Sequence, residues 1–200
     1  MTLNPAQSLA HRIWFTRKAW IAAEKRLLDN EYHTQLLLVV YSAYTTCISV
    51  ILLSYESKPV DKKLIDTAMV VLAVILFGLS LYLNSKSFKD RAARFKSGYL
   101  DLHDIEIALG VLSAQFGTAG TITGSVQILS DRYTKALRDV ENHSEIDDIC
   151  GRRSAGIGLT SRHLSRGEQV RHCWWRIWRW MALAAMYMMP IAAVVWFVLK

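Results

Sequence analysis

The sequence predicts an all-α integral membrane protein that carries a small charged domain. Three apolar runs support this prediction, at residues 34–54, 64–83 and 177–199. Each run is about as long as the roughly 20 helical residues that cross a hydrocarbon core of about 30 Å. Because no water satisfies the backbone inside lipid, only helices and closed barrels span it. We therefore expect a two-helix transmembrane hairpin and a third transmembrane helix.

Residues 1–33 are predicted to form an amphipathic arm. Asn4-Pro5 is typical of an N-cap followed by proline at the first helical position. Apolar pairs then recur every seven residues with cations between them, which favours a helix lying on the membrane surface with Trp14 and Trp20 at the interface. Packing against the charged domain is the alternative. A helix that continues directly into the first span also fits.

The connection at 55–63 is too short to hold a domain, so the first two runs are expected to pair as an antiparallel hairpin. Lys and Arg number five in residues 1–33, three in 55–63 and fourteen in 84–176. Basic residues near the ends of spans stay on the cytoplasmic side. The arm and the central region, and with them the N-terminus, are therefore predicted to be cytosolic in a multi-pass protein.

Residues 84–142 are predicted to form a cytosolic helical hairpin. Large apolar residues lie at strict seven-residue intervals, with others at the three- or four-residue offsets and charges on the remaining faces. This pattern indicates a long helix with coiled-coil-like pairing. Glycines between 117 and 124 break it, and a second helix folds back along the first. The residues predicted to mediate oligomerisation are Phe88, Phe95, Tyr99, Leu102, Ile105, Leu109 and Leu112.

Residues 143–173 lose this periodicity and are interpreted as a basic loop with short helical pieces. Its cations suit a phosphate, whether in a headgroup, a nucleotide or a nucleic acid, although membrane orientation alone also produces a positive juxtamembrane loop. Tryptophans interleaved with Arg176 and Arg179 then predict an interfacial aromatic belt at the start of the third run. The basic residues are Arg152, Arg153, Arg162 and Arg166, and the belt residues are Trp174, Trp175 and Trp178.

Polar residues share one side of the first apolar run. Small hydroxyls on one helical face either allow close packing between helices or line water in an oligomeric pore, and the two uses are compatible if the seam opens. Asp66 lies three residues into the second run, where it is either a mouth residue paired with a lysine or part of a cation-attracting ring. The stripe consists of Gln35, Ser42, Thr45, Thr46 and Ser49.

Catalysis is not predicted. The six histidines show no metal-ligand spacing, the glycines at 117, 120 and 124 lack the residues of a phosphate loop, and no nucleophile lies near a base in a known pattern. We therefore expect no enzyme activity, no metal and no cofactor.

The architecture also resembles a known family. A basic amphipathic arm, a two-span hairpin with a short outer turn and the helix SKSFKDRAARFKSGYLDLHDIE resemble the SLATT superfamily of bacterial two-span effectors. The segment LSDRYTKAL is similar to the second cytosolic helix of the subset associated with reverse transcriptases. The third apolar run departs from the two-span plan.

This resemblance implies an effector of antiviral defence that breaches the bacterial inner membrane and arrests or kills the infected cell. It also implies a homo-oligomer in membrane lipid and a co-encoded partner, either a reverse transcriptase or a nucleotide-signal synthase. Direct binding of a nucleotide or nucleic acid is the less favoured interpretation. A non-catalytic membrane anchor that recruits a partner defence enzyme is the alternative function.

Overall fold

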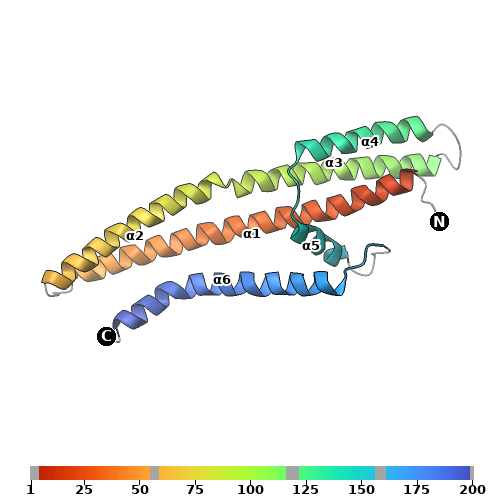
Figure 1. Ribbon diagram of the computed structural model, residues 1–200. Coiled ribbons are helices and arrows are strands. Elements are labelled where there is room, and N and C mark those ends of the chain that lie inside the picture. The colour runs from red at the N-terminus through yellow and green to blue at the C-terminus, as the bar shows by residue number, and fades with distance from the viewer. Residues whose placement is uncertain (1–4, 55–58, 116–121, 156–160, 199–200) are drawn as a thin grey trace. The chain divides into compact units, whose positions relative to one another are not determined.

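The chain is helical almost throughout in a computed structural model that describes residues 5–54, 59–115, 122–155 and 161–198 (Figure 1). No strand occurs among these residues. The predicted all-α fold class is confirmed. The helices are α1 (Pro5–Ser54), α2 (Pro59–Ser85), α3 (Phe88–Gln115), α4 (Ile122–Asp139), α5 (Glu145–Ala155) and α6 (Arg166–Val198).

These helices divide into two units, each described below by itself. The first, called the helical domain, comprises Met1–Leu28 and Lys89–Trp174. The second, called the apolar unit, comprises Asp29–Phe88 and Trp175–Lys200. Helix α1 is continuous from the arm into the first apolar run, and it contributes residues to both units.

In the helical domain, the N-terminal part of α1 packs against α3. Trp20 is only 2% exposed, and its ring meets the ring of Phe95 edge to face at 6.3 Å between centroids. Ile13 and Leu27, which share the apolar face of the arm, are fully buried as well. The expectation that Trp20 lies at the membrane interface is therefore wrong, because burial in this core already removes its indole from water.

The seven-residue pattern of α3 is explained by the same core. Phe95, Leu102, Ile105 and Leu109 are all buried within one chain, and α4 lies alongside α3 (Figure 1). The residues of α4 that face this core are Leu129, Tyr133, Ala136 and Val140. A heptad pattern cannot distinguish a partner helix in the same chain from one in another copy, since both bury the same face.

The predicted basic loop at 143–173 contains more helix than expected. It holds all of α5 and the first turns of α6. Both helices begin with a Ser-x-x-acid motif in which the acid accepts the backbone N–H of the serine: Asp147 from Ser144 at 2.9 Å and Glu168 from Ser165 at 2.8 Å. Each bond satisfies the N–H of the capping serine, and at α6 the N–H of Glu168 also donates to the Ser165 hydroxyl at 3.2 Å, which completes a capping box.

A glycine allows α5 to approach the backbone of α1. A Cβ placed on Gly151 would lie 2.7 Å from both the carbonyl carbon and the carbonyl oxygen of Lys18. No side chain fits at that distance, and a backbone inside a helix cannot shift as a flexible side chain can. Gly110 of α3 provides a contrast, because a Cβ there meets nothing within 4 Å.

The break between α2 and α3 lies at the polar stretch that ends the second apolar run. Ser87 adopts a φ of 46°, and its backbone N–H donates to the carbonyl of Asn84 at 3.2 Å. A left-handed residue after the last turn is a common way to end a helix. The two helices are therefore distinct elements.

The apolar unit holds the second part of α1, α2 and most of α6. Two stretches of the described chain, within Pro5–Ile51 and Asp66–Ala114, are long and apolar enough to cross a membrane. No residue of either apolar window is buried inside the protein. A soluble protein would bury such helices in its core, so their exposure favours hydrocarbon as the solvent around them.

We expect Gly151→Ala to destabilise the helical domain by about 1–3 kcal/mol, because the new methyl group overpacks a contact with backbone. The matched substitution Gly110→Ala should instead stabilise α3 by about 0.5–1 kcal/mol, since it only removes flexibility. Thermal melts of the detergent-purified chain, followed by circular dichroism, measure both. Equal melting temperatures for the two variants would contradict the close approach of α5 to α1.

Candidate functional site

Asp147 is the most deeply buried charged residue described in the helical domain. It is 1% exposed, and Arg26 of α1 binds it with two hydrogen bonds, Nε to Oδ1 at 2.7 Å and Nη2 to Oδ2 at 3.0 Å. The Ser144 hydroxyl donates to the same carboxylate at 2.6 Å. One carboxylate thus caps α5 and ties it to α1. A bidentate guanidinium is the geometry in which a buried carboxylate is best compensated.

The surroundings of Asp147 keep it ionised. Burial raises the pKa of its carboxyl group, but the hydrogen bonds from Arg26 and Ser144 together outweigh burial, and the net pKa is lowered from its ordinary value. The same hydrogen bond from Asp147 raises the pKa of Arg26. Folding therefore binds fewer protons at Asp147 than the unfolded chain does at acidic pH.

Arg152 connects α5 to α6. It is 7% exposed, donates from Nε to Asp148 at 3.0 Å, and pairs through Nη2 with Glu168, the capping acid of α6. Arg152 and the backbone of Ser165 together lower the pKa of Glu168 to about 2. Arg152 is therefore occupied by acids of its own chain, and the prediction that it belongs to a free basic loop needs correction. Arg153 and Arg166 are exposed.

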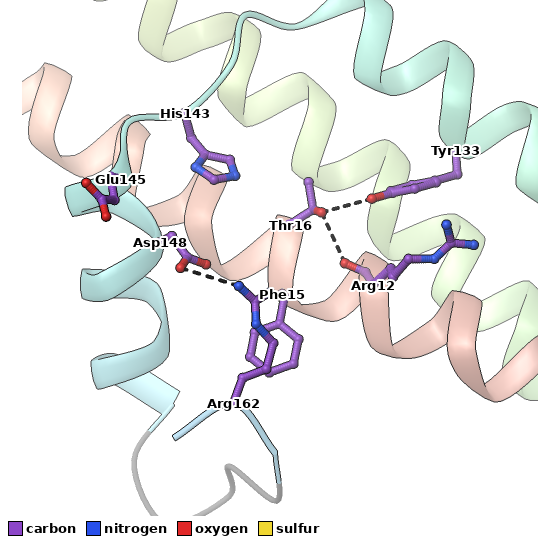
Figure 2. A pocket seen from close by; sticks show the side chains of 8 residues that line it. All are labelled: Arg12, Phe15, Thr16, Tyr133, His143, Glu145, Asp148 and Arg162. Carbon is purple, nitrogen blue, oxygen red and sulfur yellow. Dashed lines mark hydrogen bonds and ion pairs between the residues drawn. The ribbon is translucent and has the colours of Figure 1, made fainter. Parts of the chain in front are cut away.

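A groove of about 360 Å³ lies beside this junction (Figure 2). In it the guanidinium of Arg162 lies 4.9 Å from the centre of the Phe15 ring and 3.7 Å from a carboxylate oxygen of Asp148. The hydroxyls of Thr16 and Tyr133 are 3.0 Å apart on the opposite wall. The groove is lined by Arg12, Phe15, Thr16, Tyr133, His143, Glu145, Asp148 and Arg162.

Both carboxylates that line this groove are paired with arginine. Glu145 accepts from Arg171 at 2.5 Å, and Asp148 receives both Arg152 and Arg162. Such mixed pairing leaves little net field to attract a phosphate. Among the described residues, no three His, Cys, Asp or Glu side chains are grouped as metal ligands. The groove is therefore better suited to holding α1, α4 and α5 together than to chemistry.

In the apolar unit, the predicted polar stripe of α1 is exposed. Gln35, Ser42, Thr46 and Ser49 are exposed and Thr45 is half-buried. The hydroxyls donate back to carbonyls of their own helix: Ser42 to Val39 at 3.0 Å, Thr45 and Thr46 to Ser42 at 2.9 Å, and Ser49 to Thr45 at 2.9 Å. This bonding lets a hydroxyl enter lipid without an unsatisfied donor, and it leaves oxygen lone pairs for a further partner.

A different face of α1 contacts α6 at a proline. Pro190 lies inside α6 and has no N–H to donate to the carbonyl of Met186, four residues earlier. The hydroxyl of Tyr41 donates to that carbonyl at 2.9 Å, and the hydroxyl of Tyr44 donates to the carbonyl of Pro190 at 2.6 Å. Sequence reasoning missed both tyrosines. The signal was available, because a proline inside an apolar helix requires another donor for its freed carbonyl.

The remaining predicted residues can be placed individually. Asp66 is exposed on α2, and Trp174 and Trp178 are largely exposed, as an interfacial belt requires. Trp175 lies 5.5 Å from the Arg179 guanidinium. Trp14 is half-buried beside Lys18. Of the predicted oligomerisation residues, Phe88, Tyr99 and Leu112 are half-buried rather than fully enclosed.

Comparison with known protein families places this chain. Residues 2–196 match SMODS and SLOG-associating 2TM effector domain family 5. The chain belongs to this family. The match covers both units and all six helices up to residue 196. No curated protein and no solved structure matches the chain.

The family agrees with the SLATT resemblance and with the two exposed apolar helices, and both identify the chain as a membrane protein. Its description names two-span effector domains associated with SMODS and SLOG, so the family is one of effectors in defence systems. The family description names no catalytic activity.

We expect Asp147→Asn to destabilise the helical domain by about 2–4 kcal/mol at pH 7, because Arg26 keeps its charge and loses its partner. The pKa of Asp147 is lowered in the fold, so its contribution is complete above the ordinary value near 3.8 and is lost as the pH falls through the lower folded pKa. The penalty of the substitution should therefore shrink from pH 7 to pH 3. Melting of the detergent-purified chain across that range measures it.

Some acid sensitivity should remain in this variant because Glu168 titrates in the same window, with its pKa lowered to about 2. Asp101→Asn, at an exposed position of α3, is the control and should leave the pH dependence unchanged. A constant penalty for Asp147→Asn at every pH would contradict the ionised pair.

Proposed function

We propose that the chain is a membrane effector of a bacterial anti-phage system of the abortive-infection type, which oligomerises and permeabilises the inner membrane when a cytosolic signal activates it. The helical domain, with most of the basic residues, is the cytosolic receiver of that signal. Family membership supports the effector role. The exposed hydroxyl stripe of α1 supports the leak and is the single observation that carries it.

The stripe favours a leak between copies because, among the described residues, it has no tertiary hydrogen-bond partner. In that part of the chain Ser42, Thr46 and Ser49 bond to their own helix, whereas the tyrosine face of α1 is occupied by α6. A polar row on a helix that is otherwise apolar is stabilised by a second copy or by water. A chain of this size cannot enclose an aqueous path alone, so several copies surround it.

We also propose that α6 adds a third span. The family description counts two, yet α6 contacts α1 deep in the first apolar run through Tyr41 and Tyr44. Those contacts satisfy carbonyls at Pro190 that lipid could not satisfy. With a cytosolic N-terminus, the first span crosses to the periplasm and the second returns to the cytosol. Helix α6 then crosses to the periplasm again.

A membrane anchor for a partner protein is the second candidate, and one feature of α3 favours it. Leu100, Ile107 and Val111 are 50%, 53% and 48% exposed on the side of α3 opposite the core. Their spacing of seven and four residues places them in one row along the helix. A partner or a second copy that covers this row would be recruited without any leak.

The third span predicts the location of the last residue. Alkaline phosphatase fused after Lys200 should be active in the periplasm, and green fluorescent protein fused there should be dark. A fusion that ends at Ser87, after two spans, should give bright fluorescence instead. A bright fusion after Lys200 would restrict the protein to two spans.

The leak predicts the effect of filling the hydroxyl stripe. The chain is induced in a bacterial host together with its flanking genes, and membrane potential is followed with a voltage-sensitive dye. We expect depolarisation and growth arrest for the natural sequence, and normal potential for Ser42→Leu with Ser49→Leu, because the bulky apolar side chains dewet the seam.

Ala43→Leu is the matched control, since Ala43 is exposed on the same span outside the stripe, and it should depolarise like the natural sequence. Normal growth and sustained potential with the natural sequence would rule out the leak. If the natural sequence causes no leak, yet it and both variants (Ser42→Leu with Ser49→Leu, and Ala43→Leu) bring a co-encoded protein to the membrane fraction, the chain is better described as an anchor.

A further inference from the structure

We propose that the apolar unit binds one anionic phospholipid of the cytoplasmic leaflet in a pocket between α1 and α6. This inference rests on the proposed placement of both helices in the membrane. The pocket has a volume of about 230 Å³, equal to about seven or eight water molecules at about 30 Å³ each. That volume accommodates a phosphate with part of its glycerol.

The pocket straddles the level at which the two apolar runs begin. Its α1 lining runs from Asn30 to Leu37, while the first apolar run starts at residue 34. Its α6 lining runs from Arg179 to Met186, while the third run starts at 177. Tyr41 contacts Met186 and Tyr44 contacts Pro190, so α1 and α6 run in the same direction. Both helices therefore enter the bilayer from the same side. The pocket therefore lies at the boundary between headgroups and acyl chains.

The polar and apolar lining is ordered along this direction. Asn30, His33 and Arg179 lie at the end nearer water, where Phe88 is the one large apolar lining residue, and Leu37, Leu183 and Met186 lie further into the runs. A phospholipid has the same order, with a charged phosphate above an acyl chain. A free phosphate or nucleotide would leave the apolar end of the pocket uncovered.

Arg179 is the cation of this site. The described residues around it do not use all the hydrogen-bond donors of its guanidinium. Its Nη2 lies 3.9 Å from the carboxylate of Asp29, which is longer than a hydrogen bond, and its guanidinium carbon lies 5.5 Å from the centre of the Trp175 ring. Among the described residues no hydrogen-bond acceptor is found for this guanidinium. Five donors in a planar fork match the oxygens of a phosphate diester.

His33 is held on the other wall. Its Nδ1 is 3.3 Å from the hydroxyl of Tyr187, and the two rings meet edge to face. This contact holds the ring of His33, which lines the pocket and adds a second polar residue to it. Basic pockets between spans on the cytoplasmic side are recurrent sites for anionic lipids.

The test uses the full chain, purified in detergent and stripped of lipid, with native mass spectrometry to count bound phospholipid. Phosphatidylglycerol and phosphatidylcholine with identical acyl chains are the two probes. We expect one phosphatidylglycerol to be retained at least about tenfold more tightly than phosphatidylcholine, because only the first leaves the phosphate charge unneutralised for Arg179. Equal retention of the two lipids would overturn the proposal.

Arg179→Gln should lower retention of phosphatidylglycerol about tenfold. Arg176→Gln is the matched control, since Arg176 is exposed on the same helix and does not line the pocket, and it should leave retention unchanged. Equal losses in the two variants would indicate attraction by the basic belt as a whole and would overturn the site. Ala182→Phe, which fills the pocket and keeps every charge, should also release the lipid, and it decides the question if Arg179→Gln does not fold.

Inorganic phosphate is added as a competitor. It should fail to displace the lipid, and full displacement would mean that the pocket binds free phosphate instead. The amount of retained lipid is measured independently of any membrane leak. A chain that depolarises cells without retaining phosphatidylglycerol would overturn the lipid site alone, and one that retains it without depolarising cells would overturn only the effector mechanism.

Discussion

The helical domain depends on one buried carboxylate. Asp147 receives two hydrogen bonds from Arg26 and two from Ser144, so it closes the N-terminus of α5 and fixes α5 against α1. Removing water from an ion costs several kcal/mol, and a single hydrogen bond returns only part of this. The site is stable because all four contacts are present together. Gly151 contributes by letting the two backbones approach closely enough for Arg26 to reach.

The apolar unit has the opposite constraint. The hydrocarbon around it can form no hydrogen bond with a polar group, so each polar group must find its partner within the protein. Its hydroxyls donate to carbonyls of their own helix or, at Tyr41 and Tyr44, to carbonyls of α6. Pro190 makes this contact specific. It removes one donor from α6, and a tyrosine from α1 replaces it, so the two helices can pack in only one register without leaving the Met186 carbonyl unpaired.

Much of this fold could be predicted from the sequence, since strong periodicity and run length are local signals. The long helix α3 and the second helix α4 after the glycines agree with the apolar spacing, and a continuous α1 was one of the alternatives left open. The local sequence does not show which surface an apolar helix face packs against. Trp20 and Phe95 have the same pattern whether they bury against lipid, another copy or each other, and only the tertiary structure distinguishes these outcomes.

The residues of the candidate site were harder to find for the same reason. The hydroxyl stripe was visible because it repeats along one helix, whereas Arg26 and Asp147 are 121 residues apart and share no motif. The Ser-x-x-acid pairs at Ser144 and Ser165 were local and could have predicted both α5 and the early start of α6. They were hidden by the glycine, serine and arginine content of the stretch, which is typical of loops.

The two units therefore differ in what can act on them. The helical domain is held by ion pairs of α5, whose strength depends on protonation and on competing charge. The contacts between α1 and α6 at Pro190 are hydroxyl–carbonyl bonds, which screening by salt affects little. In the function proposed above, a charged signal would act on the first set of contacts, and the leak would follow the hydroxyl stripe on another face of α1. The proposed mechanism uses this division, because its signal arrives in water and its leak crosses lipid.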